Sequence, residues 1–73
     1  MPIHRHIQST VDSIEPEEDR LSIKLLDIPG SFWVATVHEE LVTTLRRALQ
    51  TGIILELTVV THSGEIADAR PEA

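Results

Sequence analysis

Hydrophobic and polar positions along this chain of 73 residues follow two different periods. Residues 36–52, TVHEELVTTLRRALQTG, carry apolar side chains spaced as on one face of a helix. These apolar positions are Leu41, Val42, Leu45, Ala48 and Leu49. Thr36, followed three residues later by Glu39, matches a capping box, and Gly52 is suited to end a helix. The pattern predicts one helix near residues 37–51.

The segment before the helix has the period of two that is typical of strands. In residues 3–14, IHRHIQSTVDSI, the apolar residues keep one parity as far as Val11, whereas Ile14 has the opposite parity. A β-bulge near Asp12 or Ser13 would return Ile14 to the core side of a long, bent first strand. The alternative is that Ile14 begins the next turn.

Further strands are predicted from alternation between turn signals. The segment SFWVA is apolar on both parities, so we expect both of its faces to be covered. The predicted strands after the first are residues 20–27, 31–35, 53–61 and 66–70, and the predicted turns are EPEED at 15–19, IPGS at 28–31 and HSGE at 62–65.

The order of three strands, one helix and two strands resembles the OB-fold, a five-stranded Greek-key barrel with its helix between the third and fourth strands. The resemblance covers residues 3–70 and is one of element order. We therefore expect a mainly β chain forming a small OB-like barrel, as a single domain over residues 1–73 with an ordered core at about 3–70. The alternative is an open α+β sheet packed on the same helix.

The resemblance also implies a ligand surface on the second and third strands and the adjoining loops. Residues that fall there are Arg20, Lys24, Leu26, Trp33 (or Phe32) and His62. Trp33 serves either as a stacking or interface residue or as core filler beside Phe32. Leu26 interrupts the polar face of its strand, which fits a contact with the helix, a contact with another subunit, or a single exposed apolar side chain.

Charge narrows the choice of partners. Twelve acidic residues against six basic ones give a formal net charge of −6, which disfavours binding to nucleic acid. No apolar stretch reaches the length of a membrane span and no signal-peptide pattern begins the chain, so we expect a cytoplasmic protein that does not enter membranes. The acidic EPEED segment is interpreted as a solvated turn.

Candidate chemistry is sparse. His4 and His6 lie two residues apart, which on a strand directs both imidazoles to one side and suits two ligands of a metal; the alternative is a pair of solvated histidines. The sequence identifies no third ligand, and we expect no cofactor. No motif links a nucleophile to a base and an orienting group, so we do not expect an enzyme.

A short chain without cysteine has a small core and no disulfide to support it, which favours self-association. We therefore expect a non-enzymatic interaction or assembly module whose partner is a second copy of the chain or another protein. The alternative is an oligonucleotide- or oligosaccharide-binding domain that uses Trp33, Arg20 and Lys24.

Overall fold

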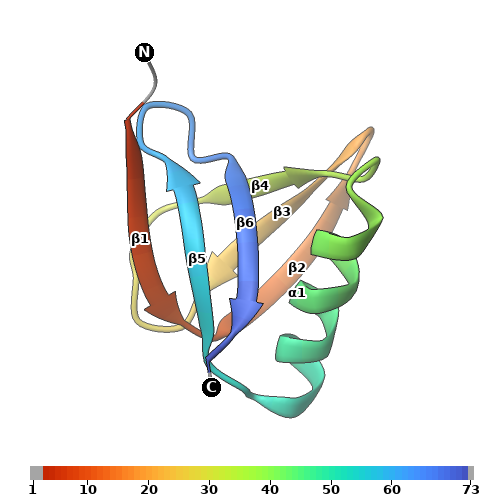
Figure 1. The fold of residues 1–73 in the computed structure, drawn as a ribbon. Coiled ribbons are helices and arrows are strands. Elements are labelled where there is room, and N and C mark those ends of the chain that lie inside the picture. Colours follow the sequence, from red (N-terminus) through yellow and green to blue (C-terminus); the bar gives the residue numbers. More distant parts are fainter. Residues whose placement is uncertain (1–2, 73) are drawn as a thin grey trace.

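The structure is a computed structural model that describes residues 3–72. Strands make up most of the described chain, and one helix interrupts their succession (Figure 1). The elements are β1 (His4–Ser9), β2 (Val11–Glu17), β3 (Arg20–Leu25), β4 (Phe32–Ala35), α1 (Glu39–Thr51), β5 (Leu55–Val60) and β6 (Ile66–Pro71).

The strands form two antiparallel sheets of three strands each. One sheet has the order β1-β5-β6 and the other the order β2-β3-β4. In Figure 1 the first sheet stands in front of the second, and α1 lies at one side of both. Helix α1 packs against β2 and β6, and β4 contacts β6. The fold is therefore mainly β, with one helix covering the side where the two sheets diverge.

The core lies between the sheets and beneath the helix. Because side chains alternate along a strand, each strand contributes every second residue to this interior. The largest side chains that are fully buried are Ile23, Val34, Leu45, Leu55, Leu57 and Ile66. They come from both sheets and from α1, so the apolar parity read in the sequence is the inner face of each sheet.

The first predicted strand is divided in two at Thr10. β1 pairs with β5, whereas β2 pairs with β3. The register shifts between Val11 and Ser13, which confirms the predicted bulge, and Ile14 lies opposite Ile23 and packs against the core. The bulge lies within β2, directly after the division at Thr10, and it bends the strand there.

The expected closed barrel of five strands is not confirmed. Six strands form two separate sheets, and an isolated parallel bridge between Trp33 and Glu65 joins β4 to the start of β6. The cause is the corner at Thr10, which turns one expected strand into two with different partners. What the structure supports is the coarser expectation, a mainly β chain with one helix.

The start of the helix differs from the prediction. α1 begins at Glu39, and its N-cap His38 makes no side-chain capping hydrogen bond. The hydroxyl of Thr36 instead donates to the carbonyl oxygen of Asp19 at 3.1 Å. The predicted capping box is therefore wrong, because Thr36 is held at the end of β4 against the β2–β3 turn.

The end of the helix agrees with the prediction. Gly52 adopts φ +74°, and its N–H donates to the carbonyl of Ala48 at 2.8 Å, which closes the last turn. Leu45 and Ala48 are fully buried, whereas Leu49, which the sequence assigned to the same apolar stripe, is 41% exposed. Among residues 3–72, no helix has the length and apolar character needed to cross a membrane.

The acidic turn is shorter than predicted. β2 continues through Glu17, and the turn itself is formed by Glu18 and Asp19. Pro16 lies within β2 opposite Leu21, at the edge of its sheet, where a strand tolerates a residue without an N–H.

Candidate functional site

Arg20 and Trp33 meet on the outer face of the β2-β3-β4 sheet. Trp33 lies opposite Ser22, and Ala35 lies opposite Arg20, so Arg20 and Trp33 are diagonal neighbours on adjacent strands. The guanidinium carbon of Arg20 is 4.3 Å from the centroid of the Trp33 ring, which is a cation–π contact. The Arg20 side chain remains 46% exposed, so the stack is accessible from solvent.

The same tryptophan contacts the turn between β5 and β6. Its indole Nε1 donates to the carbonyl oxygen of Ser63 at 3.0 Å, and its backbone N–H donates to that of Gly64 at 3.1 Å. The isolated parallel β-bridge between Trp33 and Glu65 lies next to these two hydrogen bonds. Trp33 therefore joins the two sheets through one side-chain and one backbone hydrogen bond, and it is half-buried as a result.

The other candidate residues from the sequence are dispersed. Phe32 faces the core and is 8% exposed, whereas Leu26, just beyond β3, is 57% exposed. Lys24 is exposed on β3, and His62 is exposed in the turn next to Ser63. The structure thus brings Arg20 and Trp33 together beside the turn that carries His62, and it directs Phe32 inward.

Leu26 borders a shallow hollow of about 550 Å³. Its lining comes from the β2 bulge, the end of β3 and the following loop, and it includes Asp12, Lys24, Asp27 and Pro29. The backbone N–H of Leu26 donates to the carbonyl of Thr10 at 3.1 Å, so this hollow adjoins the corner between β1 and β2.

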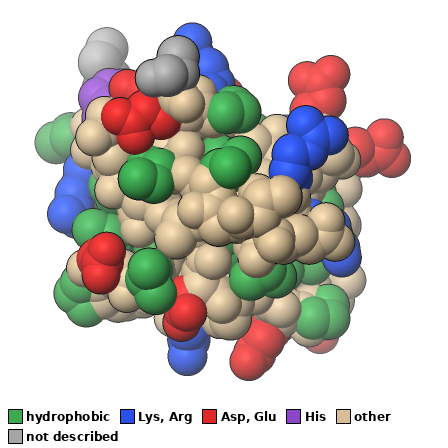
Figure 2. Space-filling model, turned by 90° about the horizontal axis from the view of Figure 1, so that it is seen from below, with side chains coloured by type: hydrophobic (Ala, Val, Ile, Leu, Met, Phe, Trp, Pro, Cys, Tyr) green, Lys and Arg blue, Asp and Glu red, His purple; other side chains and the backbone are tan. Residues whose placement is uncertain are grey.

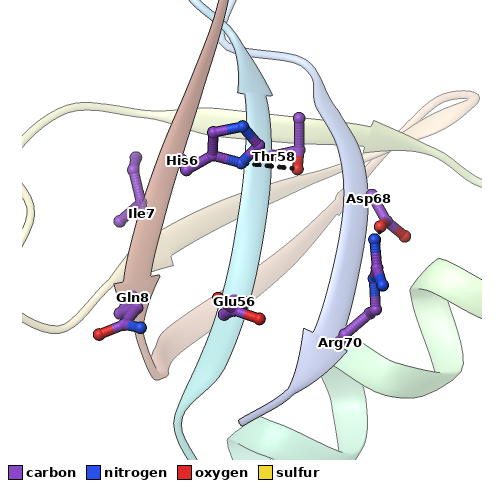
Figure 3. A pocket seen from close by; sticks show the side chains of 7 residues that line it. All are labelled: His6, Ile7, Gln8, Glu56, Thr58, Asp68 and Arg70. Carbon is purple, nitrogen blue, oxygen red and sulfur yellow. Dashed lines mark hydrogen bonds and ion pairs between the residues drawn. The ribbon is translucent and has the colours of Figure 1, made fainter.

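A second hollow of about 500 Å³ lies over the outer face of the β1-β5-β6 sheet (Figure 3). Its polar side chains stand in two rows across the three strands, because facing residues in a sheet project to the same side. One row is Gln8, Glu56 and Arg70, and the other is His6, Thr58 and Asp68. The Nε of Arg70 lies 2.9 Å from a carboxylate oxygen of Asp68.

The histidine pair lies on this second face. His6 Nδ1 is 3.3 Å from the hydroxyl oxygen of Thr58, and His4 precedes it on the same side of β1. Within residues 3–72, no three His, Cys, Asp or Glu side chains gather in a way that could hold a metal ion. The hydrogen-bond contact of His6 is thus with a hydroxyl group on the neighbouring strand β5.

The backbone of β1 is paired along one side. The N–H of Thr61 donates to the carbonyl of Ile3 at 2.9 Å, and the same register places Arg5 opposite Val59. Because hydrogen-bonded and non-hydrogen-bonded pairs alternate in an antiparallel ladder, every second residue of β1 directs its N–H and C=O away from β5. These residues are His4, His6 and Gln8.

This edge was not identified from the sequence. It depends on which strands pair, and the sequence predicted that residues 3–14 form a single strand within a closed barrel. One available signal was charge: all twelve acidic residues lie at Asp12 or later, so β1 carries Arg5 and two histidines without any carboxylate. The net charge of −6 describes the whole chain, so it does not reveal that one strand carries no acidic residue.

Comparisons with known proteins identify a shared fold and no family. No family model matches the sequence, and no curated protein matches it. Among solved structures, the chain is similar to one described as "Crystal structure of pro- protein-glutaminase", with a TM-score of 0.81 and 13% identity over 90% of this chain and 24% of that chain. The chain therefore spans about a quarter of that chain's length. At this identity the likeness shows only that this chain and the matched quarter of that chain share a fold.

Proposed function

We propose that this chain is a non-enzymatic interaction module that binds an extended segment of a protein along the open edge of β1. A strand added there completes the hydrogen bonds of His4, His6 and Gln8, and specificity comes from the alternating side chains of the added segment. The fold also occurs within a longer chain, that of the solved structure described above, which is consistent with a modular role.

The open edge of β1 is the observation that carries this proposal. β1 forms the outer edge of its sheet in Figure 1, and in the part of the chain that the structure describes it pairs with β5 alone. The other strands at the margins of the two sheets each contact a further element, since α1 packs against β2 and β6 and β4 contacts β6. Unpaired N–H and C=O groups along an edge form a template for another strand.

An apolar patch is a weaker basis for binding here. Exposed large apolar residues include Ile3, Leu26, Leu49 and Ile54, which come from different parts of the chain. Seen from below in Figure 2, the hydrophobic side chains lie in separate groups among acidic and basic ones. Scattered apolar residues of this kind are normal on protein surfaces, so the backbone edge is the more specific feature.

The test uses amide NMR spectra of the chain titrated with the peptide acetyl-Thr-Val-Thr-Val-Thr-Val-Thr-amide. We expect saturable shifts at the amides of His4, His6 and Gln8. His6→Pro should abolish them, because proline replaces an outward N–H, and His6→Thr, which keeps that N–H, should retain them. Gln8→Pro provides a second blocking variant, and the spectra themselves report whether each variant is folded.

Sedimentation of the chain alone tests whether the occupant is a second copy, as the sequence suggested. A dimer whose formation protects the His6 amide from exchange supports the proposal as an assembly module. A monomer whose edge amides respond to no peptide contradicts it.

A second candidate is a binding face for oligonucleotides or oligosaccharides in an OB-like arrangement. The observation that favours it is the Arg20–Trp33 stack, since aromatic rings and guanidinium groups both stack on bases. The Trp33–Glu65 bridge places this stack where β4 of one sheet meets the start of β6 of the other. Quenching of Trp33 fluorescence by oligo-dT or a neutral oligosaccharide at low salt supports this candidate, and an unchanged spectrum with both polymers rejects it.

A further inference from the structure

We infer that the segment that docks on β1 belongs to a different protein and carries acidic side chains beside Arg5. This inference rests on the proposed function, because it requires strand addition at the same edge. It names the charge of the partner and excludes a second copy of this chain as the occupant.

The charge of β1 is opposite to that of the rest of the chain. Residues 3–11 carry Arg5, His4 and His6 and no carboxylate, whereas the whole chain has a net charge of −6. Long-range attraction by the net charge would favour a basic partner. A preference for acidic segments must therefore come from the residues of this edge, because the net charge of the chain acts in the opposite direction.

The position of Arg5 suits a direct contact with the added strand. Arg5 shares the inward parity of Ile7, yet it is exposed, as is Ile3, which is 71% exposed. Arg5 exchanges backbone hydrogen bonds with β5, so it forms a non-hydrogen-bonded pair with a strand on the open side. Side chains approach each other most closely in such pairs, so the residue opposite Arg5 lies within reach of its guanidinium group.

The other face of β1 carries no carboxylate either. His4 and His6 project outward on that face, so an added strand meets no acidic side chain of β1 on either of its faces. The preference is limited to the N-terminal half of the edge. At the C-terminal end of β1, the N–H of Leu26 donates to the carbonyl of Thr10, and the carboxylates of Asp12 and Asp27 line the hollow beside Leu26. An acidic segment is therefore not favoured at that end.

A second copy is a poor occupant on the same grounds. A second β1 brings another Arg5 and no acidic residue to neutralise it. In a two-fold antiparallel pairing centred on Arg5, the two Arg5 side chains are directly opposed, and like charges in this position destabilise a sheet. An inward-facing charge on an edge strand is also a common device against pairing between copies.

The test compares three peptides of the form acetyl-Thr-Val-X-Val-X-Val-Thr-amide, in which X is Glu, Lys or Thr, by amide NMR titration at low salt. We expect the Glu peptide to bind about threefold to tenfold more tightly than the Lys peptide, from opposed charges across the pair. Arg5→Glu should reverse this order. Arg46→Glu makes the same change of charge on an exposed position of α1 and should leave the order unchanged.

The outcomes separate this inference from the function on which it rests. Equal binding of the three peptides at the His4, His6 and Gln8 amides supports strand docking and overturns the acidic preference. Tighter binding of the Lys peptide overturns it as well. Dimerisation of the chain through β1 supports an assembly role and overturns a foreign partner. The absence of binding by any peptide to a monomeric chain overturns both.

Discussion

The indole Nε1 of Trp33 lies 3.0 Å from the carbonyl oxygen of Ser63, thirty residues further along the chain. This bond connects β4 of one sheet with the β5–β6 turn of the other. The backbone bond from Trp33 to Gly64 lies beside it. The single tryptophan of the protein is thus anchored through its N–H, while the exposed Arg20 covers one face of its ring.

Trp33→Phe should destabilise the chain by about 0.5–1.5 kcal/mol, because it removes the indole donor and keeps an aromatic ring beside Arg20. The free energy of unfolding is measured by urea denaturation followed by circular dichroism. Arg20→Gln is the comparison, since it removes the cation–π contact and keeps the indole bond, at an expected cost of about 0.5–1 kcal/mol. Unchanged stability in Trp33→Phe would show that the indole bond does not hold the sheets together.

Gly64→Ala should cost more than Gly52→Ala. Both glycines have nearly the same positive φ, +76° and +74°, so alanine suffers a similar backbone penalty of about 1–2 kcal/mol at each site. A Cβ at Gly64 would also lie 3.0 Å from the carbonyl oxygen of Ser31, whereas nothing lies within 4 Å at Gly52. Thermal unfolding of the two variants measures the difference, and equal losses would argue against close approach of the turn to residue 31.

Leu45→Ala should destabilise the protein by about 2–5 kcal/mol, which approaches the whole stability of a small domain. Leu45 is fully buried, and Leu49, one turn later on the same helix, is 41% exposed. Leu49→Ala is therefore the matched control, with an expected loss below about 1 kcal/mol because little buried surface is removed. Similar losses in the two variants would mean that α1 is rotated relative to the structure.

Thr36→Val should leave the helical content unchanged, since the Thr36 hydroxyl bonds to Asp19 and takes no part in capping α1. The expected loss of stability is at most about 1 kcal/mol, because the hydrogen bond is exposed. Far-ultraviolet circular dichroism and the amide exchange rates of the first turn of α1 provide the measurement. Faster amide exchange confined to residues 39–42 would instead support the capping box that the sequence predicted.

Proline substitutions distinguish the two sides of β1. His6→Pro should reduce the free energy of unfolding by less than about 1 kcal/mol, because the N–H that it removes points away from β5. Arg5→Pro should cost at least about 2 kcal/mol, since it removes a hydrogen bond to Val59 and leaves a carbonyl without its partner. The reverse order would place the open side of β1 on the other set of residues and would remove the basis of the proposed docking edge.

The sequence predicted the elements of this fold well wherever local pattern decides them. The parity of residues 20–25 and 55–60, the bulge that restores Ile14 and the closing role of Gly52 all follow from side-chain alternation and backbone freedom. The start of the helix was predicted wrongly, because a carbonyl from a different strand competed for the Thr36 hydroxyl. Local pattern carries no information about such a distant acceptor.

The candidate surfaces were predicted less well, for the same physical reason. The sequence placed Arg20 and Trp33 on one predicted surface without their contact, and their stack exists because β3 and β4 pair in one particular register. The row of His6, Thr58 and Asp68 likewise comes from three strands that are distant in the sequence.

By itself, the sequence determined the helix and most strands, the inward face of residues 20–25 and 55–60 and the excess of negative charge, because these follow from residue type and spacing. Tertiary structure alone decided how the strands pair. The corner at Thr10 sends β1 and β2 into different sheets, and this separation leaves one side of β1 without a partner among residues 3–72. The acid-free composition of residues 3–11 is visible in the sequence, and it gained a meaning when pairing made that stretch an open edge.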